Sequence, residues 1–194
     1  MRIRIACLVA IGAFSLAASC LALPGLVAEA RADQKDPRLP DLFDQLLKAP
    51  TSNESEALDG EIWEIWVQAN DPKLDKLLGM GVEAMEAQDY PTALAAFNEL
   101  VKEKPDFAEG WNKRATLYYL MEDDAKSLAD IGKTLALEPR HFGALSGLGL
   151  IHLRHERYEE AAKAYQRVLA IDPMNAGALH NLDVVNDLIK KKSI

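Results

Sequence analysis

The four histidines are the side chains of this sequence best suited to bind a metal or a haem iron. His152 and His155 are three residues apart, so a helix would present both on one face. His141 and His180 lie in neighbouring segments of the chain. A zinc site needs further ligands at fixed spacing, and no third ligand accompanies this pair. We therefore expect core or surface histidines, with neither a metal nor a cofactor bound.

Short motifs that carry catalysis in common enzyme classes do not occur in the sequence. It contains no P-loop, no G-x-S-x-G and no H-E-x-x-H pattern. Both cysteines, Cys7 and Cys20, lie near the N-terminus, so the chain beyond residue 32 has no thiolate nucleophile and no disulfide. The acidic pairs Asp123-Asp124 and Glu159-Glu160 are typical of solvated turns and helix surfaces. We expect a protein that is not an enzyme.

The net charge of −8 excludes one large class of partners. Residues 1–32 contain three of the 22 basic and one of the 30 acidic side chains, which leaves the remainder near −10. Phosphate backbones repel a surface of this sign. A nucleic-acid partner is therefore not expected.

Residues 1–32 have the layout of a secretory signal peptide. Arg2 and Arg4 precede an apolar run over 5–18, and a region of small residues follows. Cleavage after Ala32 or after Ala30 fits the A-x-A rule. The sequence thus predicts a periplasmic or secreted protein.

Two alternatives for this leader keep the protein at a membrane. The segment Ala17-Ala18-Ser19-Cys20 resembles a bacterial lipoprotein box in which Cys20 would be acylated. The apolar stretch over 5–27 is also long enough to span a bilayer if it stays uncleaved, although Pro24 and Gly25 interrupt it. Membrane contact is expected only through one of these two routes.

A regular spacing of prolines organises the rest of the chain. Pro105, Pro139 and Pro173 follow one another at intervals of 34 residues. Small residues recur at two further positions of each interval, where two helices would cross closely; they are Gly81, Ala115, Gly149, Ala93, Ser127 and Ala161. A period of this length with a helix-ending proline indicates an array of two-helix repeats.

These residues resemble the tetratricopeptide repeat (TPR) family. The resemblance is close over 74–107, 108–141 and 142–175, which would be three repeats, and weak on either side. It implies an all-α fold, a right-handed α-solenoid of helix-turn-helix repeats. The family's members serve many processes as adaptors, so the motif predicts the fold more closely than the function.

The flanking segments look like caps of the array. Residues 33–40 read as an extended linker, and residues 41–72 as a degenerate TPR-like helix pair whose Trp63 and Trp66 would seal the first repeat. The alternative for the two tryptophans is an exposed aromatic site for a partner. Residues 176–190 predict a C-terminal capping helix, because Asp183 stands where a further helix would need a small residue.

The second repeat is unusually polar inside. Arg114 stands where the family usually has leucine, and its aliphatic stem could pack while its head reaches water. Ser127 and Thr134 are also polar at interior positions. These departures predict either that this repeat is the least stable of the three or that its polar groups pair with each other.

The concave groove of the family is lined by the first helix of each repeat. On this chain the resemblance gives ten candidate partner-binding residues: Leu78, Val82, Met85, Asn112, Thr116, Tyr119, Ser146, Leu150, Leu153 and His180, with Asp75, Glu109, Gly143 and Val184 on the same face. Some family members grip a partner's C-terminal carboxylate with Lys and Asn in this groove. Leu78 and Val82 occupy those positions here, which argues against such a clamp.

The predicted function is therefore a protein-binding scaffold or adaptor of the cell envelope. Its groove would take an amphipathic helix or an extended peptide. One alternative is that the chain's own N-terminal segment covers part of the groove. Another is an accessory subunit or a haem or metal chaperone in an envelope enzyme assembly, with His152 and His155 as contacts.

Overall fold

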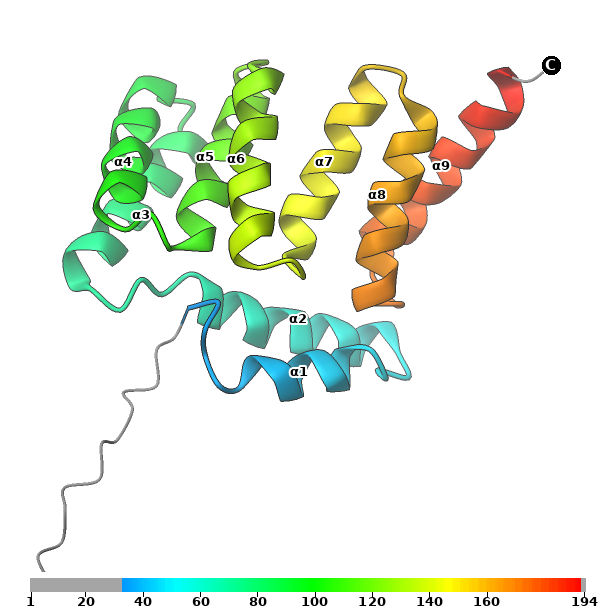
Figure 1. Ribbon diagram of the computed structural model, residues 1–194, viewed down its shortest axis with the longest axis horizontal. Coiled ribbons are helices and arrows are strands. Elements are labelled where there is room, and N and C mark those ends of the chain that lie inside the picture. Colours follow the sequence, from blue (N-terminus) through cyan, green and yellow to red (C-terminus); the bar gives the residue numbers. More distant parts are fainter. Residues whose placement is uncertain (1–32, 193–194) are drawn as a thin grey trace, which may run out of the picture.

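The structure is a computed structural model that describes residues 33–192, so the predicted leader and its cleavage sites lie outside the described residues. The regular secondary structure of this part is entirely α-helical, and the helices from α3 to α9 stand side by side (Figure 1). The helices are α1 (Leu39–Leu46), α2 (Ser52–Trp66), α3 (Pro72–Glu86), α4 (Tyr90–Glu103), α5 (Ala108–Leu120), α6 (Asp124–Leu137), α7 (Phe142–Arg154), α8 (Tyr158–Ile171) and α9 (Ala176–Lys192). None of the described helices is both long and apolar enough to cross a membrane.

Acidic residues start several of these helices by capping free backbone N–H groups. The side chain of Asp71 accepts from the N–H groups of Lys73 and Leu74 at the start of α3. Asp89 and Asp123 cap α4 and α6 in the same way. Such caps stabilise a helix by about 1 kcal/mol each. Their recurrence explains why the helix boundaries follow the repeat period so closely.

The small residues of the repeats lie where paired helices cross. A Cβ atom added to Gly81 of α3 would lie 2.7 Å from Cδ1 of Phe97 on α4. At Gly149 of α7 it would lie 2.6 Å from Cε1 of Tyr165 on α8. Each aromatic ring is fully buried against its glycine. The pairs α3–α4 and α7–α8 therefore pack with an aromatic ring directly against a glycine backbone, whereas in α5–α6 Ala115 packs with Ile131.

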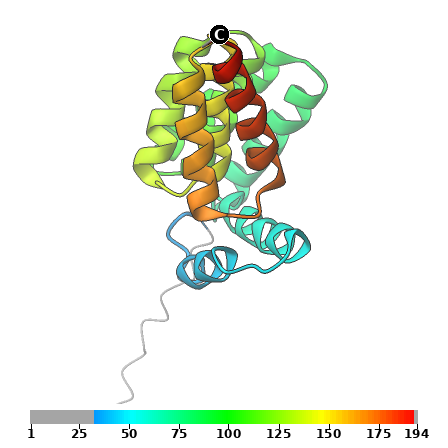
Figure 2. The ribbon, with the colours of Figure 1, turned by 90° about the vertical axis from the view of Figure 1, so that its right-hand side faces the viewer.

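Helix α9 packs on α8 at the C-terminal end of the described array. Val185 of α9 is buried in one cluster with Ala161 and Tyr165 of α8. Asp183 is exposed on the opposite side of the helix. Figure 2 shows α9 beside α8 with its outer face uncovered.

The N-terminal hairpin, which we define as α1 and α2 with their turn, does not stack on the first repeat. It runs across the lower ends of the upright helices (Figure 1). Its buried side chains share one core cluster with the third repeat and α9: Leu39, Leu42, Phe43, Leu46, Ile62, Ile65, Trp66, Phe142, Leu145, Val168 and Ala178. The expectation that Trp63 and Trp66 seal the first repeat was wrong.

The reason is that the hairpin lacks the residues that stacking requires. Counted back from Pro72, two positions at which the repeats bury apolar or small side chains are occupied by Lys48 and Glu64. Both are exposed, and α1 is only 8 residues long. The apolar face of α2 packs instead against α7, where the Trp66 ring stacks on His141 with centroids 4.2 Å apart.

The segment before α1 is packed rather than free, which corrects the expected linker over 33–40. Asp33 and Gln34 are buried, and the side chain of Gln34 hydrogen-bonds the backbone at Asp106 and Ala108 between α4 and α5. Lys35 forms an ion pair with Asp106 at 2.8 Å. The N-terminal segment and the hairpin together therefore contact all three turns that follow the repeats.

Candidate partner-binding site

A pocket of about 160 Å³ opens between α5 and α7, at the junction of the second and third repeats. Five of the ten candidate groove residues line it together: Asn112, Thr116, Tyr119, Ser146 and Leu150. Its remaining lining is small or apolar, from Ala115, Ser127, Ile131, Gly143, Ala144 and Gly147. The structure thus gathers half of the candidates around one largely apolar hollow, while their role in binding stays a prediction.

Helical spacing explains why these side chains meet. Asn112, Thr116 and Tyr119 follow one another at four and three residues along α5, so they share one face of that helix. Ser146 and Leu150 do the same on α7. The two helices occupy equivalent places in successive repeats, and their like faces therefore line the same concave surface.

Leu78 cannot line an open groove, which corrects its assignment. Its side chain is only 5% exposed and belongs to a core cluster with Phe107 and Leu117. The equivalent residues of the next two repeats are Asn112 and Ser146, which are shorter and polar. The bulky leucine packs between α3 and α5, whereas a hollow opens between α5 and α7.

The other candidates are divided among separate places. Val82 and Met85 are half-buried and pack on the core of the first repeat. Leu153 is half-buried against the cluster formed by α8 and α9. His180 is exposed on α9. None of the four lines the pocket between α5 and α7.

Tyr119 is held in place by a charged group that sequence reasoning missed. The guanidinium of Arg154 lies over its ring, 3.8 Å from the centroid, and Arg154 also donates to the Tyr119 carbonyl oxygen. Oδ1 of Asp124 accepts a 2.8 Å hydrogen bond from that guanidinium, and its Oδ2 lies 2.8 Å from Nε2 of His155. Asp124 was expected to be a solvated turn residue, yet it anchors the arginine that covers the tyrosine.

A buried polar network lies below the pocket. Glu109 and His141 are fully buried, and Oε2 of Glu109 lies 3.0 Å from Nε2 of His141. Nδ1 of His141 accepts the backbone N–H of Ala144 at the start of α7, so the ring proton belongs on Nε2 and is donated to Glu109. His141 is thus a helix cap and not a metal ligand.

Glu109 also organises its own helix. Its Oε2 accepts from the side-chain amide of Asn112 at 3.0 Å, and its Oε1 lies 3.1 Å from Nζ of Lys113. The ion pair with Lys113 offsets the cost of burying the carboxylate. Glu109 was placed on the groove face by its repeat position, but it lies beneath that face and orients Asn112.

The hairpin reaches the lower end of the pocket through one ring. A Cβ atom on Gly143 would lie 2.9 Å from Cη2 of Trp63, and Lys113 places its ammonium 5.3 Å from that ring. No residue of the hairpin lines the pocket itself. The hairpin therefore bounds the pocket at Gly143 without lining it.

The histidine pair on α7 is split between two environments. His155 is exposed and pairs with Asp124. His152 is half-buried, its Nδ1 atom has no hydrogen-bond partner, and burial lowers the pKa of its imidazole. Within residues 33–192, no group of three or more His, Cys, Asp or Glu side chains is placed to hold a metal ion.

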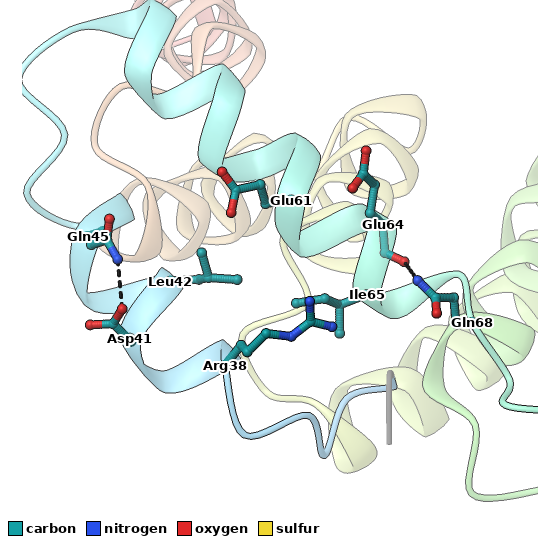
Figure 3. Close-up of a pocket in the computed structure, with 8 residues that line it drawn as sticks. All are labelled: Arg38, Asp41, Leu42, Gln45, Glu61, Glu64, Ile65 and Gln68. Carbon is teal, nitrogen blue, oxygen red and sulfur yellow. Dashed lines mark hydrogen bonds between the residues drawn. The ribbon is translucent and has the colours of Figure 1, made fainter. Parts of the chain in front are cut away.

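A second hollow, of about 370 Å³, lies on the hairpin itself and had no signal in the sequence. Figure 3 shows it between α1 and α2, with Leu42 and Ile65 at its base and Arg38, Asp41, Glu61 and Glu64 around them. Gln45 donates to Asp41 at 2.8 Å, and Gln68 donates to the Glu64 carbonyl oxygen at 2.6 Å. Its rim is more strongly charged than that of the pocket between α5 and α7.

Comparison with known proteins assigns the family. A family model described as tetratricopeptide repeat matches residues 78–133 and 121–176. A TPR repeat-containing protein of Rhizobium etli is 34% identical over 148 residues, which cover 76% of this chain and 72% of that protein. The chain therefore belongs to the TPR family, and its predicted fold, a right-handed α-solenoid, is confirmed.

Other similar proteins carry the same architecture. Small glutamine-rich tetratricopeptide repeat-containing protein 2 of Saccharomyces cerevisiae is 27% identical over 150 residues, 75% of this chain but only 43% of that protein. The solved first TPR domain of Spaghetti (RPAP3), bound to the HSP90 peptide SRMEEVD, aligns with a TM-score of 0.58 and 24% identity. That alignment covers 61% of this chain and 94% of the other. TPR proteins of this kind bind protein partners or peptides.

Proposed function

We propose that the chain is a non-catalytic scaffold of the cell envelope that holds a helix or an extended segment of a protein partner on its concave side. The observation that carries this proposal is the apolar pocket between α5 and α7, lined by candidates that share one face. An apolar hollow of roughly 150 Å³ is large enough for a benzene ring. One bulky apolar side chain of the partner would therefore fill this pocket.

Groups around the pocket can fix the orientation of the partner's backbone. Thr116 is exposed and Ser146 half-buried at the rim, so both hydroxyl groups can form hydrogen bonds there. Tyr119 offers a ring whose far face is already covered by Arg154, so little side-chain entropy is lost when a partner contacts it. An apolar hollow with a few fixed polar groups is the usual composition of a binding site.

The partner differs from one that is held by its C-terminal carboxylate. Leu78 is buried and Val82 half-buried, and neither side chain can pair with a carboxylate. The likeness to the domain solved with an HSP90 peptide is a likeness of fold. We propose recognition through an apolar side chain instead.

The envelope location rests on the leader. Two arginines, an apolar run and A-x-A sites over 1–32 support export, with cleavage after Ala32 or Ala30. Acylation at Cys20 or an uncleaved leader would place the same scaffold on a membrane. Mass spectrometry of the mature N-terminus from the envelope fraction distinguishes these outcomes.

Charged substitutions in the pocket test the binding mode. Thr116→Arg and Leu150→Glu should each reduce the yield of partner crosslinked in the envelope fraction by more than tenfold, because a buried unpaired charge is costly. Ala129→Arg, at an exposed site on α6 outside the pocket, should leave the yield unchanged. Equal capture by all three variants would contradict binding in this pocket.

The alternative function as a haem or metal chaperone has one supporting observation, the unpaired Nδ1 atom of His152. Titration of the purified protein with haem or zinc tests it by absorbance and by protection against unfolding. A change that His152→Ala abolishes would favour this function, and no change at micromolar ligand would end it.

A further inference from the structure

Two carboxyl groups meet between the hairpin and the third repeat, the half-buried Asp59 and the fully buried Asp172. Asp59 lies on α2, and Asp172 ends α8 at the proline turn of the third repeat. Oδ1 of Asp59 and Oδ2 of Asp172 are both buried, and neither has a hydrogen-bond partner. Two unpartnered carboxylate oxygens at one interface require a compensating group.

Two other turns of the same kind show what is missing. Asp36-Pro37-Arg38 and Glu138-Pro139-Arg140 each place a buried acid before the proline and an arginine after it. In both turns the arginine side chain binds the two acid oxygens at 2.9–3.0 Å. A guanidinium thus neutralises the buried acid in each of them.

The turn of the third repeat has a methionine in place of that arginine. Oδ1 of Asp172 accepts the backbone N–H of Met174 at 3.1 Å, as the other two acids do with their arginines. Because Met174 offers no guanidinium, Oδ2 is left without a cation. The hairpin covers this place, where Ser55 donates to Oδ1 at 2.7 Å.

The charges around Asp59 favour a proton as the substitute. The two charged groups that influence Asp59 electrostatically, Asp172 and Glu56, are both acidic. Its other neighbour, Asn175, contributes only a neutral side-chain amide, 3.5 Å from Oδ2. Burial, then the charge of Asp172, then that of Glu56, raise the pKa of Asp59 to about 7. An acid in this setting keeps its proton and can donate it.

We propose that Asp59 is protonated beside the buried Asp172 carboxyl group while the hairpin is docked, and that this uncharged acid latches the hairpin onto the third repeat. When the proton leaves, two like charges face each other inside the interface and the hairpin is released. Because Trp63 of the hairpin lies on Gly143, which lines the concave pocket, release also uncovers the lower end of that pocket. The latch is independent of which partner the pocket binds.

The direction of the pH dependence follows from the raised pKa. An Asp59 freed from the interface would titrate near its ordinary value of 3.8, whereas the docked one titrates near 7. The docked state therefore holds more protons between these values, and docking weakens as pH rises across that window. The equilibrium constant should fall by up to about tenfold per pH unit there and stay level above it.

Amide hydrogen exchange of the full chain tests the latch. The opening constant of the α1 and α2 amides, corrected for intrinsic exchange, should rise with pH up to about 7, while that of α5 and α6 should not. Asp59→Asn keeps a hydrogen-bond donor without charge and should remove this rise. Glu61→Gln, at an exposed carboxyl group on the same helix, should keep it.

A variant that supplies the missing arginine and a direct titration of Asp59 complete the test. Met174→Arg restores the arginine of the other two turns and should shift the rise to lower pH. The 13C resonance of the Asp59 carboxyl group should titrate near 7. Titration near 4, or a pH rise that persists in Asp59→Asn, would overturn the proposal. If millimolar Ca²⁺ restored docking at pH 8 in the native chain but not in Asp59→Asn, that result would also overturn the proposal and would indicate a cation site.

Discussion

The three repeats and the N-terminal hairpin are all helix pairs that a proline terminates, yet they bury their apolar faces in different ways. In the repeats, a small residue meets a buried side chain of the paired helix, as Gly149 meets Tyr165 and Ala115 meets Ile131, and each pair stacks on the next. In the hairpin, Gly60 stands at one of these positions but nothing lies within 4 Å of a Cβ atom added there, and Trp66 packs on the start of α7. The difference shows that close contact of a small residue at the crossing, more than the proline period, decides whether a helix pair joins the array.

The largest expected effect on stability distinguishes the packing of the hairpin from the packing of the repeats. Trp66→Ala should lower the free energy of unfolding by about 3–5 kcal/mol, because a fully buried ring is removed and leaves a cavity. Trp111→Ala should cost clearly less, since Trp111 is only half-buried within the repeats. Urea unfolding of both variants measures the contrast, and equal losses would show that the hairpin contributes no more than a surface ring.

The polar interior of the second repeat gives the next effect. Arg114 is half-buried, and its guanidinium binds Asp130 through two hydrogen bonds, at 2.7 and 2.9 Å. Arg114→Leu should therefore cost about 3 kcal/mol by leaving a buried carboxylate unpaired. The double variant Arg114→Leu with Asp130→Leu should regain most of that loss in thermal unfolding. A single variant as stable as the parent would refute the pairing.

Two glycines on α3 test whether a small residue is required where paired helices cross. Gly81→Ala should destabilise the chain by about 1–3 kcal/mol, because the added methyl group overlaps the buried ring of Phe97. Gly79→Ala is the matched control, with nothing within 4 Å of the added atom, and should stabilise α3 by about 0.5–1 kcal/mol. Chemical unfolding would contradict this requirement if both changes had the same sign.

The smallest effect concerns a single hydrogen bond of the hairpin. Ser55→Ala removes the buried donor to Asp172 and should cost about 1 kcal/mol. Thr116→Ala, whose hydroxyl group donates to the Asn112 carbonyl oxygen at an exposed site, should cost almost nothing. Differential scanning calorimetry resolves the pair, and a loss confined to Thr116→Ala would reverse the argument.

The repeats could be predicted from the sequence because their determinants are local. Gly81, Ala115 and Gly149 recur at a fixed period, and each makes its decisive contact within its own helix pair. The place of the hairpin could not be predicted in this way. It depends on contacts such as that between Ser55 and Asp172, 117 residues apart, to which no period points.

The residues of the candidate site were likewise predictable only where local helical spacing determines their position. Helical spacing was sufficient to bring Asn112, Thr116 and Tyr119 to one pocket. It was insufficient for Leu78, because burial depends on how much space the neighbouring helices leave for a large side chain. It also missed Arg154, whose role appears only when α5, α6 and α7 are in place. Ser127 and Thr134 likewise bond to backbone carbonyl groups and not to each other.

The most direct test of the account is residue-resolved hydrogen exchange of the full chain carrying Trp66→Ala. The account predicts that protection is lost in α1, α2 and the lower end of α7, around Phe142 and Leu145, while α3 and α4 keep theirs. Loss of protection in α3 and α4, with the third repeat unchanged, would instead place the hairpin on the first repeat and contradict the central claim.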